Sequence, residues 1–512
     1  MRSLLFPGAI RTFRPVLQLA LAAMLTGTLG GCVDRDPSYE DPLDTANLLE
    51  VGQKLLVLNP ARQRVEVIAA NGTDVQTSSF GLKSRPEVVL TSADGSRVVL
   101  LDVERRELAL LTVDGVKTWP LQAEFTGLAL SDDGSQAVLY HSASGQAVSS
   151  IVSTDQIALV DLAAAPSTTN PRLATLAGLS RAPVAAHIGP EVKIGAIAHR
   201  LVWVEVQNAL GVADFSQGEV RTTMVPLAAD PTANIRPART VARIATGGTD
   251  LYVIANGLDD VIHVRIDQSA QDLGVSLDQI ASGSGPADLH VFETKEGLRV
   301  FTVNAGSRDV ALLDPATGTN LAIPLQYIVN RIVPYLGQDG LQHALLLRGD
   351  ATVFTAYVVD LDDLAKRKGK ALHLVTFDHG IGQVVQAGPR FFVRPVNVAG
   401  LTVLDPDTRN KTAFNGAGVV TDLRVSGDAV FVLGKVDGQS RLSRIDAATL
   451  QGSSLTLGHV ATRLTRLGQD GIAVAGTGVA GWWIAAFPTG VLDQASGRWV
   501  EGFALQGVSE GW

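Results

Sequence analysis

The chain has 512 residues, 46% of them hydrophobic, and a formal net charge of −9. This negative balance argues against a nucleic-acid partner and against electrostatic docking on anionic lipid headgroups. With a single cysteine, the chain cannot form an internal disulfide.

The N-terminal residues predict a secretory signal. Arg2, Arg11 and Arg14 give it a positive start, and no acidic residue occurs before Asp34. The stretch Val16–Leu25 is apolar apart from one glutamine, and small residues follow it. An apolar segment of this length is typical of a cleaved signal, because it is too short for a stable membrane-spanning helix.

Leu29, Gly30, Gly31 and Cys32 resemble the lipobox of bacterial lipoproteins. The resemblance covers these four residues and the preceding signal. It implies that a peptidase recognises Leu29, Gly30 and Gly31, that the Cys32 thiol carries diacylglycerol, and that the new N-terminus is acylated. More than one acyl chain gives stable anchoring, whereas one would be marginal. The alternative is an ordinary signal peptide, residues 1–31, with a cysteine at this place by chance.

Residues 32–48 are predicted to be a lipidated N-terminus and a flexible tether. They are acidic, contain two prolines and have no apolar periodicity. As a coil they reach on the order of 20 Å. Val33, in place of an aspartate after Cys32, favours delivery to the outer membrane. Lipidation would also consume the thiol, which excludes thiolate catalysis and cysteine-ligated zinc from the body.

Residues 49–512 predict an all-β body. Runs of four to eight aliphatic residues alternate with Gly, Asp, Asn and Ser turns, and long stretches with helical apolar spacing are lacking. Asp362–Lys370 is the best helical candidate, and its basic residues 366–370 are expected in solvent.

Internal similarity predicts the architecture. The pentapeptide Leu-Gly-Gln-Asp-Gly occurs at 336–340 and again at 467–471, a spacing of 131 residues. Asp314, Asp405 and Asp446 each follow an apolar run and open a turn. A period of about 40–50 residues with several short strands is typical of a propeller blade.

The units at 250–267 and 298–318 resemble the YVTN-type propeller repeats of bacterial surface proteins. That resemblance implies a fold more than a function: a β-propeller, in one ring of seven to ten four-stranded blades. Two smaller rings are the alternative. A longer insertion or an irregular blade is expected around 142–155 and 164–200, and 51–70 is expected to pair with the last units near Trp499 to close the ring.

The segment 476–481 (GTGVAG) matches a dinucleotide-binding fingerprint, but the residues after it are strand-like. That motif works only before a helix whose N-terminus holds the pyrophosphate. A hairpin loop is therefore predicted. Trp482 and Trp483 follow it on opposite faces of a strand. One is expected in the core, and the pair is a candidate partner contact, with packing between blades as the alternative.

Catalytic residues and cofactors are not predicted. The nine histidines are scattered without zinc-type spacing, and a Gly-x-Ser-x-Gly nucleophile elbow is missing. A propeller can gather one metal ligand from each blade, as in calcium-dependent lactonases. Glu87, Asp250 and Asn304 are candidates of that kind, although nothing selects them over other turn residues, and a metal is not predicted.

The sequence thus predicts a lipid-anchored propeller of the cell envelope that binds or scaffolds a protein or glycan partner. The alternative is a propeller enzyme of the lactonase or hydrolase type with a metal in its central channel.

Overall fold

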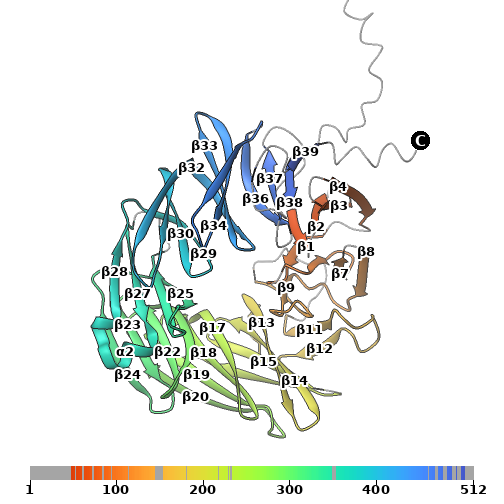
Figure 1. Ribbon diagram of the computed structural model, residues 1–512. Helices are drawn as coiled ribbons and strands as arrows, with labels where there is room; N and C mark the ends of the chain where they lie inside the picture. The colour runs from red at the N-terminus through yellow and green to blue at the C-terminus, as the bar shows by residue number, and fades with distance from the viewer. Residues whose placement is uncertain are drawn as a thin grey trace, which may run out of the picture. The chain divides into compact units, whose positions relative to one another are not determined.

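The computed structural model describes residues 48–501 except 52–53, 60–62, 72–73, 83–85, 94, 113–114, 144–153, 180, 217, 229, 231–232, 349–352, 459, 468–470, 477–480, 487–491 and 493–496. Residues Thr45–Glu501 belong to one compact unit (Figure 1). Leu48 already belongs to the first strand, one residue before the predicted start of the β body.

The described part of the chain is built from short antiparallel strands. Eight sheets have four strands and a ninth has seven, and in every sheet the strands are neighbours in chain order. The first five sheets consist of β1 (Leu48–Val51), β2 (Lys54–Asn59), β3 (Arg64–Asn71) and β4 (Asp74–Gly81); β5 (Val88–Thr91), β6 (Val98–Asp102), β7 (Glu107–Thr112) and β8 (Gly115–Pro120); β9 (Gly127–Leu130), β10 (Gln136–Tyr140), β11 (Gln156–Asp161) and β12 (Arg172–Thr175); β13 (Ala185–Ile194), β14 (Ile197–Val206), β15 (Ala209–Phe215) and β16 (Val220–Pro226); and β17 (Arg236–Ala245), β18 (Gly248–Asn256), β19 (Asp260–Asp267) and β20 (Gly274–Ala281).

The remaining sheets continue the same meander. They consist of β21 (Pro286–Thr294), β22 (Gly297–Asn304), β23 (Asp309–Asp314) and β24 (Thr319–Pro324); β25 (Arg331–Leu336), β26 (Gln342–Leu347), β27 (Thr355–Asp360) and β28 (Leu372–Thr376); β29 (Ile381–Ala387), β30 (Arg390–Pro395), β31 (Ala399–Leu404), β32 (Lys411–Ser426), β33 (Ala429–Val436), β34 (Gln439–Asp446) and β35 (Gly452–Thr456); and β36 (Ala461–Leu467), β37 (Gly471–Gly476), β38 (Gly481–Ala486) and β39 (Gly497–Glu501).

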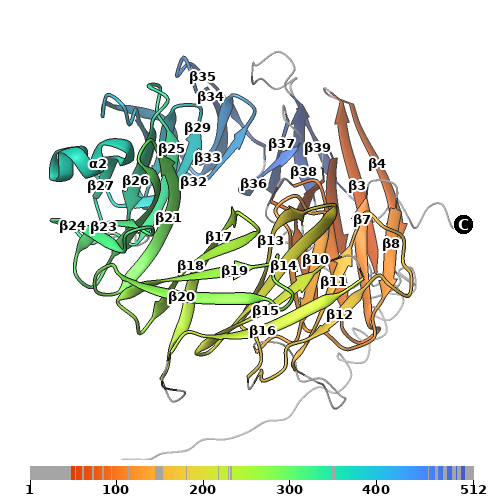
Figure 2. The ribbon, with the colours of Figure 1, turned by 90° about the horizontal axis from the view of Figure 1, so that it is seen from below.

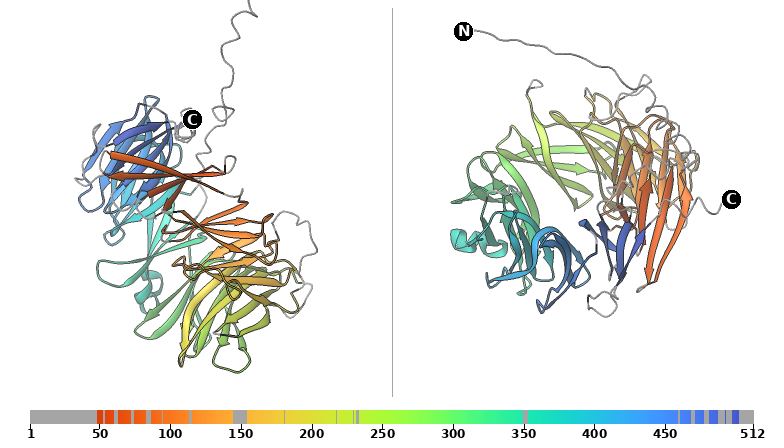
Figure 3. Two further views of the ribbon diagram at one scale, coloured as in Figure 1. Left: turned by 90° about the vertical axis from the view of Figure 1, so that its right-hand side faces the viewer. Right: turned by 90° about the horizontal axis from the view of Figure 1, so that it is seen from above.

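The apolar core lies between neighbouring sheets. One cluster joins β6–β8 to β9–β11 around the fully buried Trp119, and another joins β18–β20 to β21–β23 around Tyr252. Each sheet has two apolar faces, so its neighbours must cover both. The first strands of consecutive sheets contact one another from β5 to β25, and the sheets follow each other in chain order (Figures 2 and 3).

The long strand β32 serves two sets of partners. Its first residues, 411–414, pair with β31, whereas 419–426 pair with β33. Gly418 lies between these parts with φ +65°, and a Cβ there would meet the Lys435 carbonyl oxygen at 2.1 Å. Only glycine fits this crossing, because it has no side chain and tolerates positive φ. The seven-stranded sheet is therefore two four-stranded units that share one strand.

The first and last sheets contact each other without pairing their strands. β1 contacts β36, and β3 contacts β38. The Arg466 guanidinium bonds to the Glu50 carboxylate at 2.7 Å, and burial raises the pKa of Glu50. The expected association of 51–70 with the last units is therefore present as contacts between sheets and not as a shared strand pair, since β39 pairs with β38 and β2 pairs with β1 and β3.

A β-bulge recurs near the start of the first strand of several units. The register shifts fall at Pro237/Arg239, Pro286/Asp288, Ile381/Gln383, Val420/Asp422 and Ala461/Arg463. A bulge turns a side chain away from the regular alternation of a strand. At two of these positions the side chain is an aspartate that reaches the neighbouring sheet.

Asp288 and Asp422 make the same connection. The Asp288 carboxylate accepts hydrogen bonds from the backbone N–H of Leu289 at 2.9 Å and of Ile332, on the next sheet, at 2.7 Å. Asp422 accepts from Leu423 and from Leu464 of the following sheet, both at 2.9 Å. These carboxylates fix the spacing between first strands of consecutive sheets.

We expect Asp288→Ala to lower the free energy of unfolding by about 2 kcal/mol, because two backbone N–H groups, at Leu289 and Ile332, lose their acceptor and the half-exposed Arg239 guanidinium loses its ion pair. Urea unfolding measures the loss. Glu293→Ala on the same strand is the matched control, since Glu293 is exposed and pairs only at the surface with Arg243. Equal losses in the two variants would contradict the assigned role of Asp288.

Three further expectations have outcomes in the described residues. The predicted helix is present as α2 (Leu361–Arg367), followed by a 3-10 turn, η4 (Lys368–Ala371), with residues 366–370 exposed. The departure expected at 164–200 is confirmed in part. Residues 162–171 form bends and turns with an isolated bridge between Ser167 and Asn170, and the pairing of β13 with β14 has a register shift between Ile188 and Glu191, although β12, β13 and β14 are sheet strands. Most of 142–155 lies outside the described residues.

The segment 476–481 joins two paired antiparallel strands, β37 and β38, so the predicted hairpin is confirmed.

Candidate functional site

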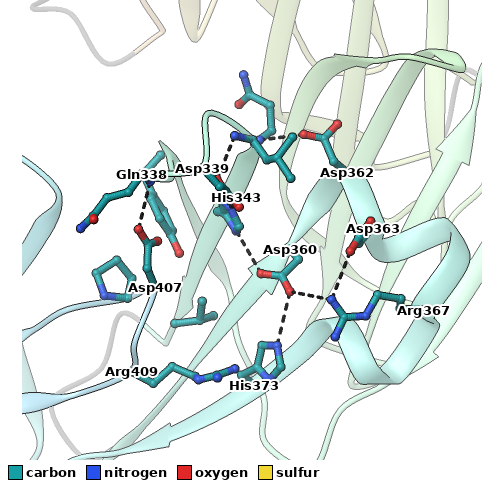
Figure 4. Close-up of a pocket in the computed structure, with 15 residues that line it drawn as sticks. Gln338, Asp339, His343, Asp360, Asp362, Asp363, Arg367, His373, Asp407 and Arg409 are labelled. Atoms are coloured by element: carbon teal, nitrogen blue, oxygen red, sulfur yellow. Dashed lines mark hydrogen bonds and ion pairs between the residues drawn. The ribbon is translucent and has the colours of Figure 1, made fainter.

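A pocket of about 500 Å³ lies at one end of the β25–β28 sheet and extends to the β31–β32 turn of the next sheet (Figure 4). It is lined by Tyr335, Gln338, Asp339, Leu341, Gln342, His343, Val358, Asp360, Asp362, Asp363, Arg367, His373, Pro406, Asp407 and Arg409. The β25–β26 loop, the α2 segment and the β31–β32 turn supply most of these residues.

The pocket lies where one unit differs from the others at a repeated aspartate position. An aspartate recurs at the end of the third strand of a unit, where its carboxylate accepts a backbone N–H of the following turn. This holds for Asp161 with Ala163, Asp267 with Ser269, Asp314 with Ala316, Asp405 with Thr408 and Asp446 with Thr449. Such local bonds are typical of Asx turns.

Asp360 occupies the same repeat position, at the end of β27, but α2 and η4 replace the short turn. Its side chain does not cap the helix. The carboxylate instead bonds to His343 Nδ1 at 3.0 Å and contacts His373 Nε2 at 3.4 Å. Arg367 of α2 lies 3.8 Å from it. The helical insertion thus turns a structural aspartate toward the pocket.

The inserted helix has local reasons to form. Asp362 and Asp363 are in its first turn, and Lys366 and Arg367 are in its last, which suits the helix dipole. Leu361 and Leu364 are buried on one face. Asp362 also accepts the backbone N–H of Gln342 at 2.8 Å, so the helix is attached to the start of β26.

His343 is held between two carboxylates. Its Nδ1 bonds to Asp360, and its Nε2 bonds to Asp339 at 3.1 Å (Figure 4). The hydrogen bond with Asp360, followed by that with Asp339, raises the pKa of His343 to about 9. The ring is therefore an imidazolium at neutral pH, and both nitrogens donate. The hydrogen bond from His343 also lowers the pKa of Asp360.

Tyr335 packs behind this histidine. Its ring stacks on His343 with centroids 5.3 Å apart and meets Phe391 edge-on. The residue is 5% exposed, and its hydroxyl lacks a hydrogen-bond partner among the described residues. Burial, and then the carboxylates of Asp407, Asp360 and Asp339, raise the pKa of Tyr335. The phenol is therefore protonated.

The repeated pentapeptide supplies part of the pocket. Residues 336–340 lie between β25 and β26, and 467–471 lie between β36 and β37, so both copies join the first two strands of a unit. In the first copy, the Gln338 backbone N–H donates to Asp407 of the next sheet at 3.0 Å. This bond joins the loop to the β31–β32 turn across the pocket.

Among the described residues, the lining of the pocket lacks aliphatic hydroxyl, thiol and amine groups. The lining residues include no Ser, Thr, Cys or Lys, and the Tyr335 phenol is protonated. His343 cannot act as a general base, because both ring nitrogens already donate to carboxylates. The pocket offers carboxylate oxygens and one unpartnered hydroxyl, which are recognition groups.

The residues singled out in the sequence do not meet in this pocket. Glu87 accepts the Val103 N–H, Asp250 pairs with His263, and Asn304 bonds to Asp309, so each has a partner in its own sheet. In the described part of the chain, His, Cys, Asp and Glu form no group of three or more suited to a metal ion.

The other candidates lie outside what the structure describes. Leu29, Gly30, Gly31 and Cys32 precede the first described residue. Trp482 and Trp483 are placed on β38, but their side chains are outside the described part. Within residues 48–501 as described, no helix has the length and apolar character to cross a membrane.

The pocket itself was missed by sequence reasoning, although two signals could have found it. Asp360 shares the place of Asp314 and Asp446 but precedes the only predicted helix instead of a turn. The pentapeptide at 336–340 lies one hairpin away from it. The signal in the sequence was therefore an aspartate at a repeated position that is followed by a helix and not by a turn.

Four-stranded antiparallel sheets that pack face to face in chain order define a propeller-type repeat protein. In comparisons with known proteins, neither a family model nor a curated protein matches the chain. Among solved structures, a dihydro-heme d1 dehydrogenase, NirN, in complex with DHE is similar at TM-score 0.41 and 14% identity, over 73% of this chain and 76% of that chain.

Two other propeller structures are also similar. Apo AztD from Citrobacter koseri has a TM-score of 0.34 and 11% identity, over 71% of this chain and 95% of its own. A streptogramin B lyase has a TM-score of 0.29 and 12% identity, over 54% and 87%. At these values, nothing about the activity of this chain follows from them.

Proposed function

We propose that the protein is a lipid-anchored propeller of the cell envelope that binds or scaffolds a protein or glycan partner, and that the pocket around Asp360 is its recognition site. The observation that carries the proposal is the altered repeat at β27, where an inserted helix brings Asp360 and its neighbours into a polar pocket lined by carboxylates.

We also propose a single ring of ten four-stranded blades, with β32 shared by two of them. This is the upper end of the range expected from the sequence. The contacts of β1 with β36 and of β3 with β38 support closure, as does the ion pair between Arg466 and Glu50. Side-chain packing, without a shared strand, would then close the ring.

We expect Cys32→Ser to abolish labelling by a radioactive fatty acid and to release the protein from the membrane fraction or leave it uncleaved. The reason is that the thiol is the acceptor of the lipid, and the serine hydroxyl does not replace it. Metabolic labelling and fractionation measure this. The matched control is Ser38→Ala in the proposed tether, which should leave both unchanged. Full labelling of Cys32→Ser would refute the anchor.

The binding function is tested by capture from the native envelope with the lipidated protein. A partner retained by the wild type and lost with Asp360→Asn supports the pocket as the recognition site.

The alternative, a hydrolase with a channel metal, requires a converging group of ligands. A calcium-dependent rise in the thermal midpoint would favour that alternative, because a ligand specific for the folded state stabilises it.

A further inference from the structure

The pocket around Asp360 has an excess of negative charge. Five aspartates line it, against Arg367, Arg409 and the imidazolium of His343. Asp360 is engaged with His343 and the α2 arginine. Asp407 is different: within the described residues, its carboxylate accepts one hydrogen bond, from Gln338. Acceptor capacity therefore remains on Asp407, and the pocket as a whole keeps an excess of carboxylates.

The Tyr335 hydroxyl is an independent sign of a missing ligand atom. Tyr335 lines the pocket and is 95% buried, and its buried hydroxyl has no partner among the described residues. Buried hydroxyls are normally hydrogen-bonded, because leaving one unpaired is costly. Tyr357 of the same sheet follows this rule, since its hydroxyl accepts the backbone N–H groups of Gln326 and Tyr327, both at 3.0 Å.

We propose that this pocket binds an organic cation, whose ammonium or guanidinium N–H groups donate to the carboxylates of Asp407 and Asp339 and to the Tyr335 hydroxyl oxygen. The inference deepens the binding function proposed above and rests on it. The carboxylates neutralise the ligand charge, and the hydroxyl gains the partner that it lacks.

The same observations argue against other ligand classes. An anion would be repelled by the excess of aspartates, and a neutral sugar would leave that charge uncompensated. A volume of about 500 Å³ is within the range of small-molecule pockets. A lysine or arginine side chain of a protein partner and a free polyamine share the required chemistry.

The experiment is isothermal titration calorimetry of the full-length protein with four probes. They are spermidine, lysine amide and arginine amide acetylated only at the α-amino group, and neutral N-acetylglucosamine. We expect saturable one-to-one binding of a cationic probe, weakened by salt, and none of the sugar. Tight binding of spermidine alone would identify a free polyamine, whereas binding of the amino-acid amides would indicate a cationic side chain of a partner.

Variants localise the site. Asp407→Asn retains an acceptor for Gln338 but loses the charge, and it should weaken binding roughly 10-fold or more. Tyr335→Phe should weaken it roughly 3- to 10-fold without lowering the thermal midpoint, because the free protein loses no hydrogen bond. Asp278→Asn, at an exposed pair on another sheet, is the matched control and should bind like the wild type.

The proposal is overturned if no cationic probe saturates, if Asp407→Asn and Tyr335→Phe bind like the wild type, or if calcium alone occupies the site and displaces the cation. The capture experiment tests the proposed binding function separately from the proposed cation site. A partner retained equally by the wild type and Asp407→Asn would leave that function standing and overturn the cation.

Discussion

Asp214→Ala is expected to lower the free energy of unfolding by about 3–5 kcal/mol. Asp214 on β15 is fully buried, and its carboxylate accepts hydrogen bonds from Arg221 at 2.5 Å and from His199 Nδ1 at 2.9 Å. Its other oxygen accepts from Gln268 Nε2 at 2.8 Å. Removing the carboxylate leaves a nearly buried guanidinium without its counter-charge, which costs far more than a lost surface pair.

This network also joins two sheets. Arg221 is on β16, whereas Gln268 follows β19 of the next sheet and accepts the Thr249 hydroxyl at 2.8 Å. Arg221 additionally donates to the Gln268 carbonyl at 2.7 Å. The loss should therefore weaken packing between β13–β16 and β17–β20 as well as local strand pairing.

Urea unfolding of Asp214→Ala and Asp278→Ala separates a buried from an exposed ion pair. Asp278 and its partner Arg265 are each about half exposed, and their separation should cost at most about 1 kcal/mol. Asp214→Asn should lie between the two, since it still accepts from Gln268. If Asp214→Ala and Asp278→Ala unfold at the same urea concentration, the network has no special role.

The strands that the sequence predicted are mostly the second and third of each sheet. Examples are β6 with β7 and β22 with β23, whose residues are mostly buried. Neighbouring sheets cover both faces of these strands, so their sequences are continuous aliphatic runs. First and fourth strands such as β17 and β20 are half exposed and carry many polar residues. In the sequence they were therefore read as parts of the turns between the apolar strands.

The contacts that hold the sheets together were less visible for a different reason. Asp288 and Asp422 act through a bulge that shifts the register by one residue, and a single sequence does not reveal a bulge. Contact between the first unit and the last units was predicted, but the ion pair of Glu50 with Arg466 that forms part of it was not. Side chains about 400 positions apart in the chain meet only in the folded protein.

The candidate pocket combines what could and could not be predicted. The helix at 361–367 and the repeated pentapeptide were both visible in the sequence. Their convergence was not, because it depends on the β31–β32 turn of the next sheet, which brings Asp407 to Gln338. The histidines appeared scattered, yet His343 and His373 both contact Asp360. Spacing rules detect ligands on one element and miss those gathered from several.

His343→Gln is expected to change the pH dependence of stability. Because the pKa of His343 is raised to about 9 in the folded protein, it stabilises the fold fully below its unfolded pKa of about 6.5. This contribution, at most about 3 kcal/mol, is lost as the pH rises through 9. The wild type should therefore exceed the variant most near pH 6, and the two should converge near pH 10.

His290→Gln is the control of opposite sign. Burial lowers the pKa of His290, so its neutral form is favoured in the fold. Its contribution is present above the unfolded pKa of about 6.5 and is lost as the pH falls below that value through the lower folded pKa. Urea unfolding at a series of pH values measures both differences. If the gap between the wild type and His343→Gln stays constant from pH 6 to pH 10, then Asp360 and Asp339 do not hold His343 as an imidazolium. The pocket would then lose one of the positive charges on which its charge balance depends.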